Sequence, residues 1–300
     1  MFQTEQYQLL DFGGGRKLER FGNILTDRPS PPASGTAPRA PRRWREADLF
    51  FRNDEKEKSV GSFGVRGIWQ ARTPEGTAFL ESGGTVVHTV PDFTLELKGS
   101  PFGHLGIFPE QSPNWDRLYR LCRQGAEKLA RPIRVLNLFA YTGGSSLACA
   151  AAGAEVTHVD AARNIVAQSR RNAELSGLKD APIHWIADDA VKYVKREEKR
   201  KKEYEGIILD PPAYGHGTRG EVWRLTRDLP RLLSALSVIL APDFFFILLT
   251  CHSPGFDALR LAALLSDLRP GRIESGAMSL TAATGAKLSA GYFALLSSCR

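Results

Sequence analysis

Several carboxylates and one thiol follow apolar, strand-like segments in the second half of this 300-residue chain. They are Asp160, Asp188, Asp189, Asp210 and Cys251. Asp160 ends the segment THVD and Asp210 ends GIILD, whereas the Asp188–Asp189 pair follows HWIA and Cys251 follows FFFILLT. Carboxylate oxygens accept hydrogen bonds from hydroxyl and amino groups, and a thiolate is a nucleophile. Because parallel strands bring their carboxyl ends to one edge of an open α/β sheet, we expect these groups to surround one ligand site.

The stretch from Val135 to Asp160 predicts a strand, a tight turn at Gly143 and Gly144, a helix of small residues, and a second strand. A carboxylate at the end of that second strand can accept hydrogen bonds from both hydroxyls of a ribose. The dinucleotide fingerprint Gly-x-Gly-x-x-Gly is missing, since residues 140–147 read AYTGGSSL. A cofactor with a ribose and a zwitterionic tail but no phosphate fits better, which indicates S-adenosylmethionine.

The remaining patterns predict an α/β sheet with helices between its strands. Helical periodicity favours helices over residues 114–129 and 164–178, and apolar runs favour strands over 184–187, 206–210, 244–250, 272–279 and 291–298. Each chemically interesting residue then lies at the carboxyl end of a predicted parallel strand.

Six short motifs, in this order, resemble the class I S-adenosylmethionine-dependent methyltransferases, and within them the branch of the bacterial large-subunit ribosomal RNA cytosine-5 methyltransferases. They are NLFAYTGG (137–144), VD (159–160), RNAELSGL (171–178), DDA (188–190), LDPPAYG (209–215) and TC (250–251). GHLGIFPEQ (103–111) is similar to the segment that closes over the cofactor in that branch. The resemblance runs from about residue 100 to the end. It implies a Rossmann-like sheet of seven strands whose last hairpin is antiparallel.

Carried over by position, the resemblance implies a role for each motif residue. The turn that would wrap the methionine part and the ribose comprises Asn137, Phe139, Ala140, Tyr141, Thr142, Gly143 and Gly144. Asp160 would hold the ribose hydroxyls, and Asp189 or Asp188 would accept from the adenine amino group. Asp210 would lie between cofactor and substrate and orient the base, while Pro211, Pro212 and Tyr214 would form the substrate pocket.

Cys251 decides how far the target atom can be specified. Carbon 5 of cytosine becomes a nucleophile when a thiolate adds to carbon 6, so a cysteine at the pocket indicates that chemistry. Methylation of a guanine, which the same branch also contains, needs no thiol. A non-catalytic RNA-binding protein that retains the sheet is a third possibility. The motif order favours RNA cytosine methylation with Cys251 as the attacking group and Asp210 as the orienting one.

Each of these residues also has a purely structural interpretation. Cys251 could be a small buried hydrophobic residue, Asp210 a helix cap, Asp160 a surface charge, and Tyr214 a core aromatic. The other cysteines, Cys122, Cys149 and Cys299, show no ligand spacing, and the six histidines form no cluster with them. We therefore expect core positions for Cys122 and Cys149, and no metal.

Composition and charge narrow the class of protein. No apolar run is long enough for a bilayer, the first ten residues lack a secretory signal pattern, and cysteines are few, so we expect a cytoplasmic enzyme. The net charge of +7 is uneven, because arginines 39, 42, 43 and 45 flank Trp44 and a second basic run covers residues 192–202. Basic clusters with an interleaved aromatic fit an RNA partner, although the second run, which contains two glutamates, is equally typical of a solvated helix.

The chain divides into two predicted domains. Residues 1–112 form a small β-rich module, with strands over 63–69, 85–90 and 93–98, and residues 113–300 form the methyltransferase domain. Residues 28–45 are rich in proline and arginine, and we expect them to be extended and partly mobile. Nothing in the sequence indicates an oligomeric state.

Overall fold

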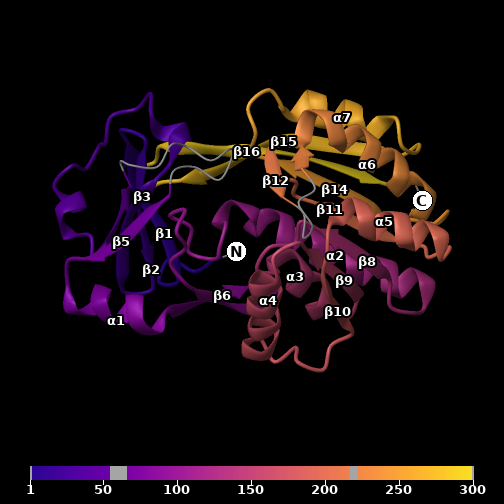
Figure 1. Ribbon diagram of the computed structural model, residues 1–300, viewed down its shortest axis with the longest axis horizontal. Helices are drawn as coiled ribbons and strands as arrows, with labels where there is room; N and C mark the ends of the chain where they lie inside the picture. Colours follow the sequence, from indigo (N-terminus) through magenta and orange to yellow (C-terminus); the bar gives the residue numbers. More distant parts are fainter. Residues whose placement is uncertain (1, 55–65, 217–221, 299–300) are drawn as a thin grey trace. The chain divides into compact units, whose positions relative to one another are not determined.

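The structure is a computed structural model that describes residues 2–54, 66–216 and 222–298. It contains two compact units (Figure 1). The first comprises Met1–Val90, Thr94–Ser112 and Met278–Ala290, and the second comprises Pro91–Phe93, Pro113–Ala277 and Gly291–Arg300, as far as these residues are described. Residues 278–290, which the sequence patterns place with the methyltransferase domain, thus belong to the first unit.

A five-stranded sheet, ordered β1-β2-β3-β4-β5, forms the centre of the first unit. Its strands are β1 (Tyr7–Gly13), β2 (Arg16–Phe21), β3 (Ile24–Pro29), β4 (Leu49–Asn53) and β5 (Gly67–Ala71). Among the described residues of this sheet, β3 and β4 pair in parallel and the other pairs are antiparallel. The short helices are η1 (Pro31–Ala33), η2 (Arg43–Glu46), α1 (Pro74–Ser82) and η4 (Pro109–Gln111), and β6 (Gly84–Thr89) pairs with β7 (Asp92–Leu97).

The sequence patterns missed β1 to β4 because charged side chains occupy buried positions in these strands. Glu19 and Arg28 are both buried and form an ion pair, and the Tyr7 hydroxyl donates to Glu19 at 2.9 Å. The pKa of Glu19 is lowered to about 2, because Arg28 and Lys17 outweigh the effect of burial. An alternation of polar and apolar residues cannot reveal strands whose inward face carries such pairs. Strands β5, β6 and β7 confirm three of the predicted segments, although residues 63–65 lie outside the described ranges.

A seven-stranded sheet, ordered β10-β9-β8-β11-β14-β16-β15, forms the second unit's centre. Its strands are β8 (Arg134–Leu138), β9 (Glu155–Asp160), β10 (Ile183–Ala187), β11 (Gly206–Leu209), β14 (Phe246–Cys251), β15 (Arg272–Thr281) and β16 (Lys287–Ser297). The five strands from β10 to β14 pair in parallel, and β16 pairs antiparallel with β14. This confirms the predicted Rossmann-like sheet.

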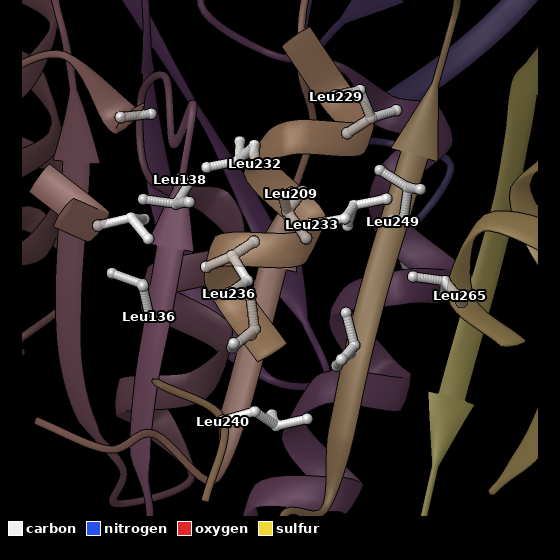
Figure 2. Packing of buried hydrophobic residues seen from close by; sticks show 14 of the residues in the cluster. Leu136, Leu138, Leu209, Leu229, Leu232, Leu233, Leu236, Leu240, Leu249 and Leu265 are labelled. Carbon is white, nitrogen blue, oxygen red and sulfur yellow. The ribbon is translucent and has the colours of Figure 1, made fainter. Parts of the chain in front are cut away.

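Helices cover both faces of this sheet (Figure 1). They are α2 (Ser112–Leu129), α3 (Gly144–Ala151), α4 (Arg163–Leu175), α5 (Ala190–Lys199), α6 (Leu225–Ile239) and α7 (Ala258–Ser266). Figure 2 shows leucines of α6 packed on Leu138, Leu209 and Leu249 of the strands below. Burial of each such side chain contributes about 1.5–3 kcal/mol. Within the described residues, no helix has the length and apolar content that a membrane span needs.

The order of the strands fixes where a ligand can lie. Strands β9 and β10 extend the sheet on one side of β8, whereas β11 and β14 extend it on the other. Such a reversal leaves a crevice beyond the carboxyl ends of the two strands that flank it, here β8 and β11. The glycine turn after β8 and Asp210 after β11 therefore follow neighbouring parallel strands at the edge of the sheet where such a crevice is expected.

Candidate active site

The turn after β8 has an unusual backbone. Phe139, Tyr141 and Gly143 adopt left-handed φ angles of 56°, 48° and 93°, and α3 begins directly afterwards. Left-handed conformations strain residues that have a side chain, and such residues persist only where their surroundings hold them. Strain of this kind is concentrated at functional sites, so the turn is a candidate ligand site on its own geometry.

Side chains from β9 and α4 hold the turn in place. Asp160 accepts from the backbone N–H of Tyr141 and of Ala162, each at 2.9 Å, one at each carboxylate oxygen. From α4, the Ser169 hydroxyl donates to the Tyr141 carbonyl at 2.7 Å, and the Asn172 amide donates to the Thr142 carbonyl at 2.8 Å. These bonds fix the backbone before a ligand binds, which lowers the entropic cost of binding.

Asp160 fits a ribose because its oxygens retain acceptor capacity. Each carboxylate oxygen has two lone-pair directions, and the backbone bonds use one on each. Burial raises the pKa of Asp160, and the two backbone donors oppose that rise. A carboxylate held in this way can accept from the two neighbouring hydroxyls of a ribose.

The two glycines of the turn serve the packing of the protein. Gly143 has a positive φ, and a Cβ there would lie 3.3 Å from Ser169. A Cβ on Gly144 would lie 2.5 Å from the Trp115 ring of α2. The contacts show that both positions also need glycine for the packing of α2 and α4 around the turn. The assignment of the two glycines to the cofactor site stays a prediction.

Asn137 belongs to a series of hydrogen-bonded, buried polar side chains beneath the turn. Its amide donates to the Ser146 hydroxyl at 2.9 Å, and that hydroxyl lies 3.0 Å from Nδ1 of His158. All three residues are buried, and burial lowers the pKa of His158 to about 3. The imidazole is therefore neutral, and the series links β8, α3 and β9 directly under the turn.

The acidic pair after β10 is divided between two tasks. Asp189 caps α5 by accepting from the Lys192 backbone N–H at 2.9 Å. Asp188 accepts from the Asp189 N–H at 2.8 Å and forms an ion pair with Arg196. Both side chains are half-buried. The assignment of one of them to the adenine amino group stays a prediction.

The loop after β11 is held by a residue that the sequence did not single out. Trp223, in a hairpin of β12 (Tyr214–His216) and β13 (Val222–Arg224), donates its indole N–H to the Pro212 carbonyl at 2.7 Å. Its ring also lies 5.0 Å from that of Phe139 in the strained turn. Trp223 therefore joins the Asp-Pro-Pro loop to the glycine turn. Pro211 is buried, and Pro212 and Tyr214 are half-buried.

His252 lies against Asp210. Its Nε2 is 3.5 Å from Oδ1 of the carboxylate, and the two side chains are 36% and 30% exposed. Neighbours within a strand point to opposite faces, but β14 ends at Cys251, so this alternation does not determine where the His252 side chain points.

Cys251 belongs to the apolar core under α6 and α7. Its side chain is 0% exposed and clusters with Leu249, Phe256 and Leu261. Burial raises the pKa of its thiol, and the nearby Asp210 carboxylate raises it further, although the Ser253 N–H donates to the sulfur at 3.4 Å. Alternation along β14 places Cys251 on the same face as Ile247 and Leu249. Cys122 and Cys149 are also buried, which confirms them as core residues, whereas Cys299 lies outside the described ranges.

Comparison with known proteins decides the family. The profile of the S-adenosylmethionine-dependent methyltransferase family matches residues 110–259, half of the chain. The chain belongs to this family. A crystal structure of a SAM-dependent methyltransferase from Agrobacterium tumefaciens is 34% identical, with a TM-score of 0.86, over 99% of this chain and 92% of that one. The family is defined by its dependence on S-adenosylmethionine.

Two curated relatives match part of the methyltransferase. Ribosomal RNA large subunit methyltransferase K/L of Shewanella frigidimarina is 34% identical over 42% of this chain and 18% of its own length. Ribosomal RNA large subunit methyltransferase I of Aeromonas hydrophila is 26% identical over 69% of this chain and 49% of its own length. The chain thus spans half or less of the curated relatives that it matches.

Three positioning residues of this methyltransferase escaped the sequence interpretation. Ser169 and Asn172 are polar residues three positions apart on the inward face of an amphipathic helix, and that placement was the available signal. Trp223 gave no such signal, because only the hairpin of β12 and β13 brings it to Pro212.

Proposed function

We propose that this methyltransferase modifies a base of RNA, and that large-subunit ribosomal RNA is its substrate. The names of the two curated relatives and the basic charge of the chain support this substrate class. A single observation supports the choice of a base: the Asp210 carboxylate, 30% exposed, follows the strand that neighbours the one before the cofactor turn.

The residues around the turn fit S-adenosylmethionine. When bound, this cofactor supplies an electrophilic methyl group on a sulfonium. Asp160 would accept from its ribose hydroxyls, and Asp188 or Asp189 would accept from its adenine amino group. The strained backbone of residues 139–143 would line the methionine part. Asn137 would support the turn from below through Ser146.

Asp210 in its ionised form matches guanine best. A carboxylate only accepts hydrogen bonds, and the Watson–Crick edge of guanine presents two adjacent donors, the ring N–H and the exocyclic amine. The same edge of cytosine presents one donor beside an acceptor, so an ionised Asp210 would satisfy only half of it. Pro211, Pro212 and Tyr214 would hold the base, with the Tyr214 ring as a stacking face.

The state of Cys251 also favours a guanine nitrogen as the methyl acceptor. A covalent route requires an accessible thiolate, and Cys251 is fully buried with a raised pKa. Transfer to nitrogen needs only that the acceptor be oriented and lose a proton. His252, beside Asp210, is positioned to accept that proton.

Methylation of cytosine carbon 5 through Cys251 is the second candidate. The observation that favours it is position, because Cys251 ends the strand that neighbours β11 and its sulfur lies near Asp210. On this route a local movement of residues 252–256 would first expose the sulfur. The thiolate would then add to carbon 6 of the ring, and the resulting enamine would take the methyl from the sulfonium at carbon 5, leaving a thioether as the by-product. Removal of the carbon 5 proton by a base would then expel the Cys251 thiolate from carbon 6.

One assay tests the function and separates the two targets. Purified protein, S-adenosylmethionine labelled in the methyl group and a bacterial large-subunit ribosomal RNA transcript are incubated, and the modified nucleoside is identified by mass spectrometry. We expect a methylguanosine. Asp210→Asn should abolish transfer without loss of cofactor binding by calorimetry, and Asp180→Asn, at an exposed position, is the matched control. No transfer to RNA by the wild-type protein would refute the proposal, and 5-methylcytidine would select the second candidate.

A further inference from the structure

Four arginines are displayed on one short turn of the first unit. Arg39, Arg42, Arg43 and Arg45 are all exposed, and we call residues 39–45 the arginine turn. Arg43 and Arg45 lie in the 3-10 helix η2, and Arg42 is its N-cap residue.

A buried carboxylate fixes the backbone of the arginine turn. Asp11, in β1, accepts from the backbone N–H groups of Arg39 and Ala40 at 3.2 and 2.8 Å, and from the Trp44 indole N–H at 2.9 Å. Burial acts to raise the pKa of Asp11, but these three donors and the Phe12 backbone N–H outweigh it and lower the pKa below its usual value. The turn is thus tied to the sheet by hydrogen bonds. The 3-10 helices η1 and η2 correct the expectation that residues 28–45 are extended throughout, and their mobility stays a prediction.

Trp44 is the apolar anchor of the same turn. It is half-buried and packs against the cluster of Leu10, Leu18 and Ala47. The Arg72 guanidinium donates to the Trp44 carbonyl at 3.2 Å. The sequence pattern offered Trp44 as an aromatic for stacking on bases, but its ring and N–H are both engaged with the protein. The turn therefore presents charge rather than a stacking platform.

The arginines of this turn differ from other surface arginines of the chain. Arg123, Arg171, Arg200 and Arg227 each pair with a nearby carboxylate. Within the described residues, no ion pair neutralises the guanidinium of any of the four turn arginines. Against their four positive charges stand Glu46 at the end of η2 and the buried Asp11, which leaves a local charge of +2 (4 − 2).

We propose that the arginine turn is a docking site for the phosphate backbone of RNA, which rests on the proposed RNA substrate. Unpaired guanidinium groups bind phosphate oxygens through paired N–H donors, and they are less strongly hydrated than ammonium groups. A turn that hydrogen bonds already tie to a sheet binds with a smaller loss of entropy than a mobile tail. With its aromatic engaged, the site contacts phosphates and tolerates different base sequences.

Salt dependence of RNA binding tests this site directly. Each phosphate contact contributes about −0.7 to −0.9 to the slope of log affinity against log salt, so four contacts contribute about −3. The variant Arg39→Ala/Arg42→Ala/Arg43→Ala/Arg45→Ala should have a slope less negative by about 3. Between about 50 and 200 mM salt, the wild-type protein should then lose about 60-fold more affinity than the variant.

A matched control removes the same charge elsewhere. Lys195, Lys199, Lys201 and Lys202 are exposed around the end of α5, and their replacement by alanine also subtracts four charges. If the arginine turn is the site, the slope of log affinity against log salt for this four-lysine variant should differ from the wild-type slope by less than about 1. The single variants Arg42→Ala and Arg45→Ala provide a second measurement, each with a slope change slightly below about 1. Cofactor affinity, measured by calorimetry, should be unchanged in all variants.

The outcomes are distinct. Binding is measured by fluorescence anisotropy on the ribosomal RNA transcript, with vesicles of anionic phospholipid as a second probe. An unchanged slope in the four-arginine variant, an equal loss in both quadruple variants, or binding to vesicles but not to RNA would overturn the site. If the wild-type protein binds RNA with the expected slope but transfers no methyl group to it, the proposed function fails and the docking site stands.

Discussion

Replacing Cys251 with alanine separates a core residue from a nucleophile. The side chain is fully buried among Leu249, Phe256 and Leu261, and its thiol has a raised pKa. Since the usual value is 9.0, fewer than about one molecule in a hundred carries a thiolate at pH 7. We therefore expect Cys251→Ala to act on stability, with methyl transfer within about threefold of wild type.

The size of the stability effect follows from burial. Truncation removes one methylene-sized group from a packed core, which costs about 1 kcal/mol and somewhat more if a cavity is left. For a domain of this size that corresponds to a decrease of roughly 2–4 °C in Tm. Cys122→Ala is the matched control, because Cys122 is equally buried but lies in α2, away from Asp210.

Single-turnover methyl transfer and thermal unfolding should be measured on the same preparations. A nucleophile would behave differently, because its removal typically lowers the rate by at least about a thousandfold. RNA in which cytosine carries fluorine at carbon 5 would also trap a covalent complex with wild-type protein, since the fluorine cannot leave as a proton does. Loss of transfer in folded Cys251→Ala, together with that trapped complex, would refute the assignment of Cys251 to the core alone.

Three further predictions follow from the contacts of the site. Asp160→Asn should weaken cofactor binding about 10- to 100-fold in calorimetry, because a charged acceptor contributes about 1.5–3 kcal/mol; a change below twofold would contradict its role. Trp223→Phe keeps the ring near Phe139 but loses the donor to Pro212, so kcat should fall up to about tenfold at unchanged cofactor affinity, and an unchanged kcat would count against the link between the two loops. The pKa of His158 is about 3 in the folded protein and 6.5 in the unfolded one, so the unfolded state binds more protons between these pH values. The contribution of neutral His158 to the free energy of unfolding is therefore complete above pH 6.5 and is lost as the pH falls below it. Urea unfolding at pH 7 and pH 5 should show a loss of about 2 kcal/mol that is missing in His158→Gln, and equal losses in both proteins would disprove it.

The second unit could be predicted from the sequence because its signals are local. Parallel strands buried on both faces appear as apolar runs, and a glycine turn with a carboxylate at the next strand end has few alternative meanings. Strands β10, β11 and β14 lie within two residues of their predicted ranges, and Asp160 and Asp210 lie at the carboxyl ends expected for them. The resemblance to the family followed from the order of short motifs, and these motifs are also local features of the sequence.

The residues that support the site depend on contacts between distant parts of the chain. Trp223 acts through Pro212 and Phe139, and Asp11 holds a turn that begins 28 residues later. The sequence could name Cys251, but the face of β14 on which it lies depends on strand register and on the helices that cover that face. Sequence alone thus determined the sheet and its chemistry-bearing strand ends. Tertiary packing decided which side chains are accessible, because burial and partner distance arise only when separate segments meet.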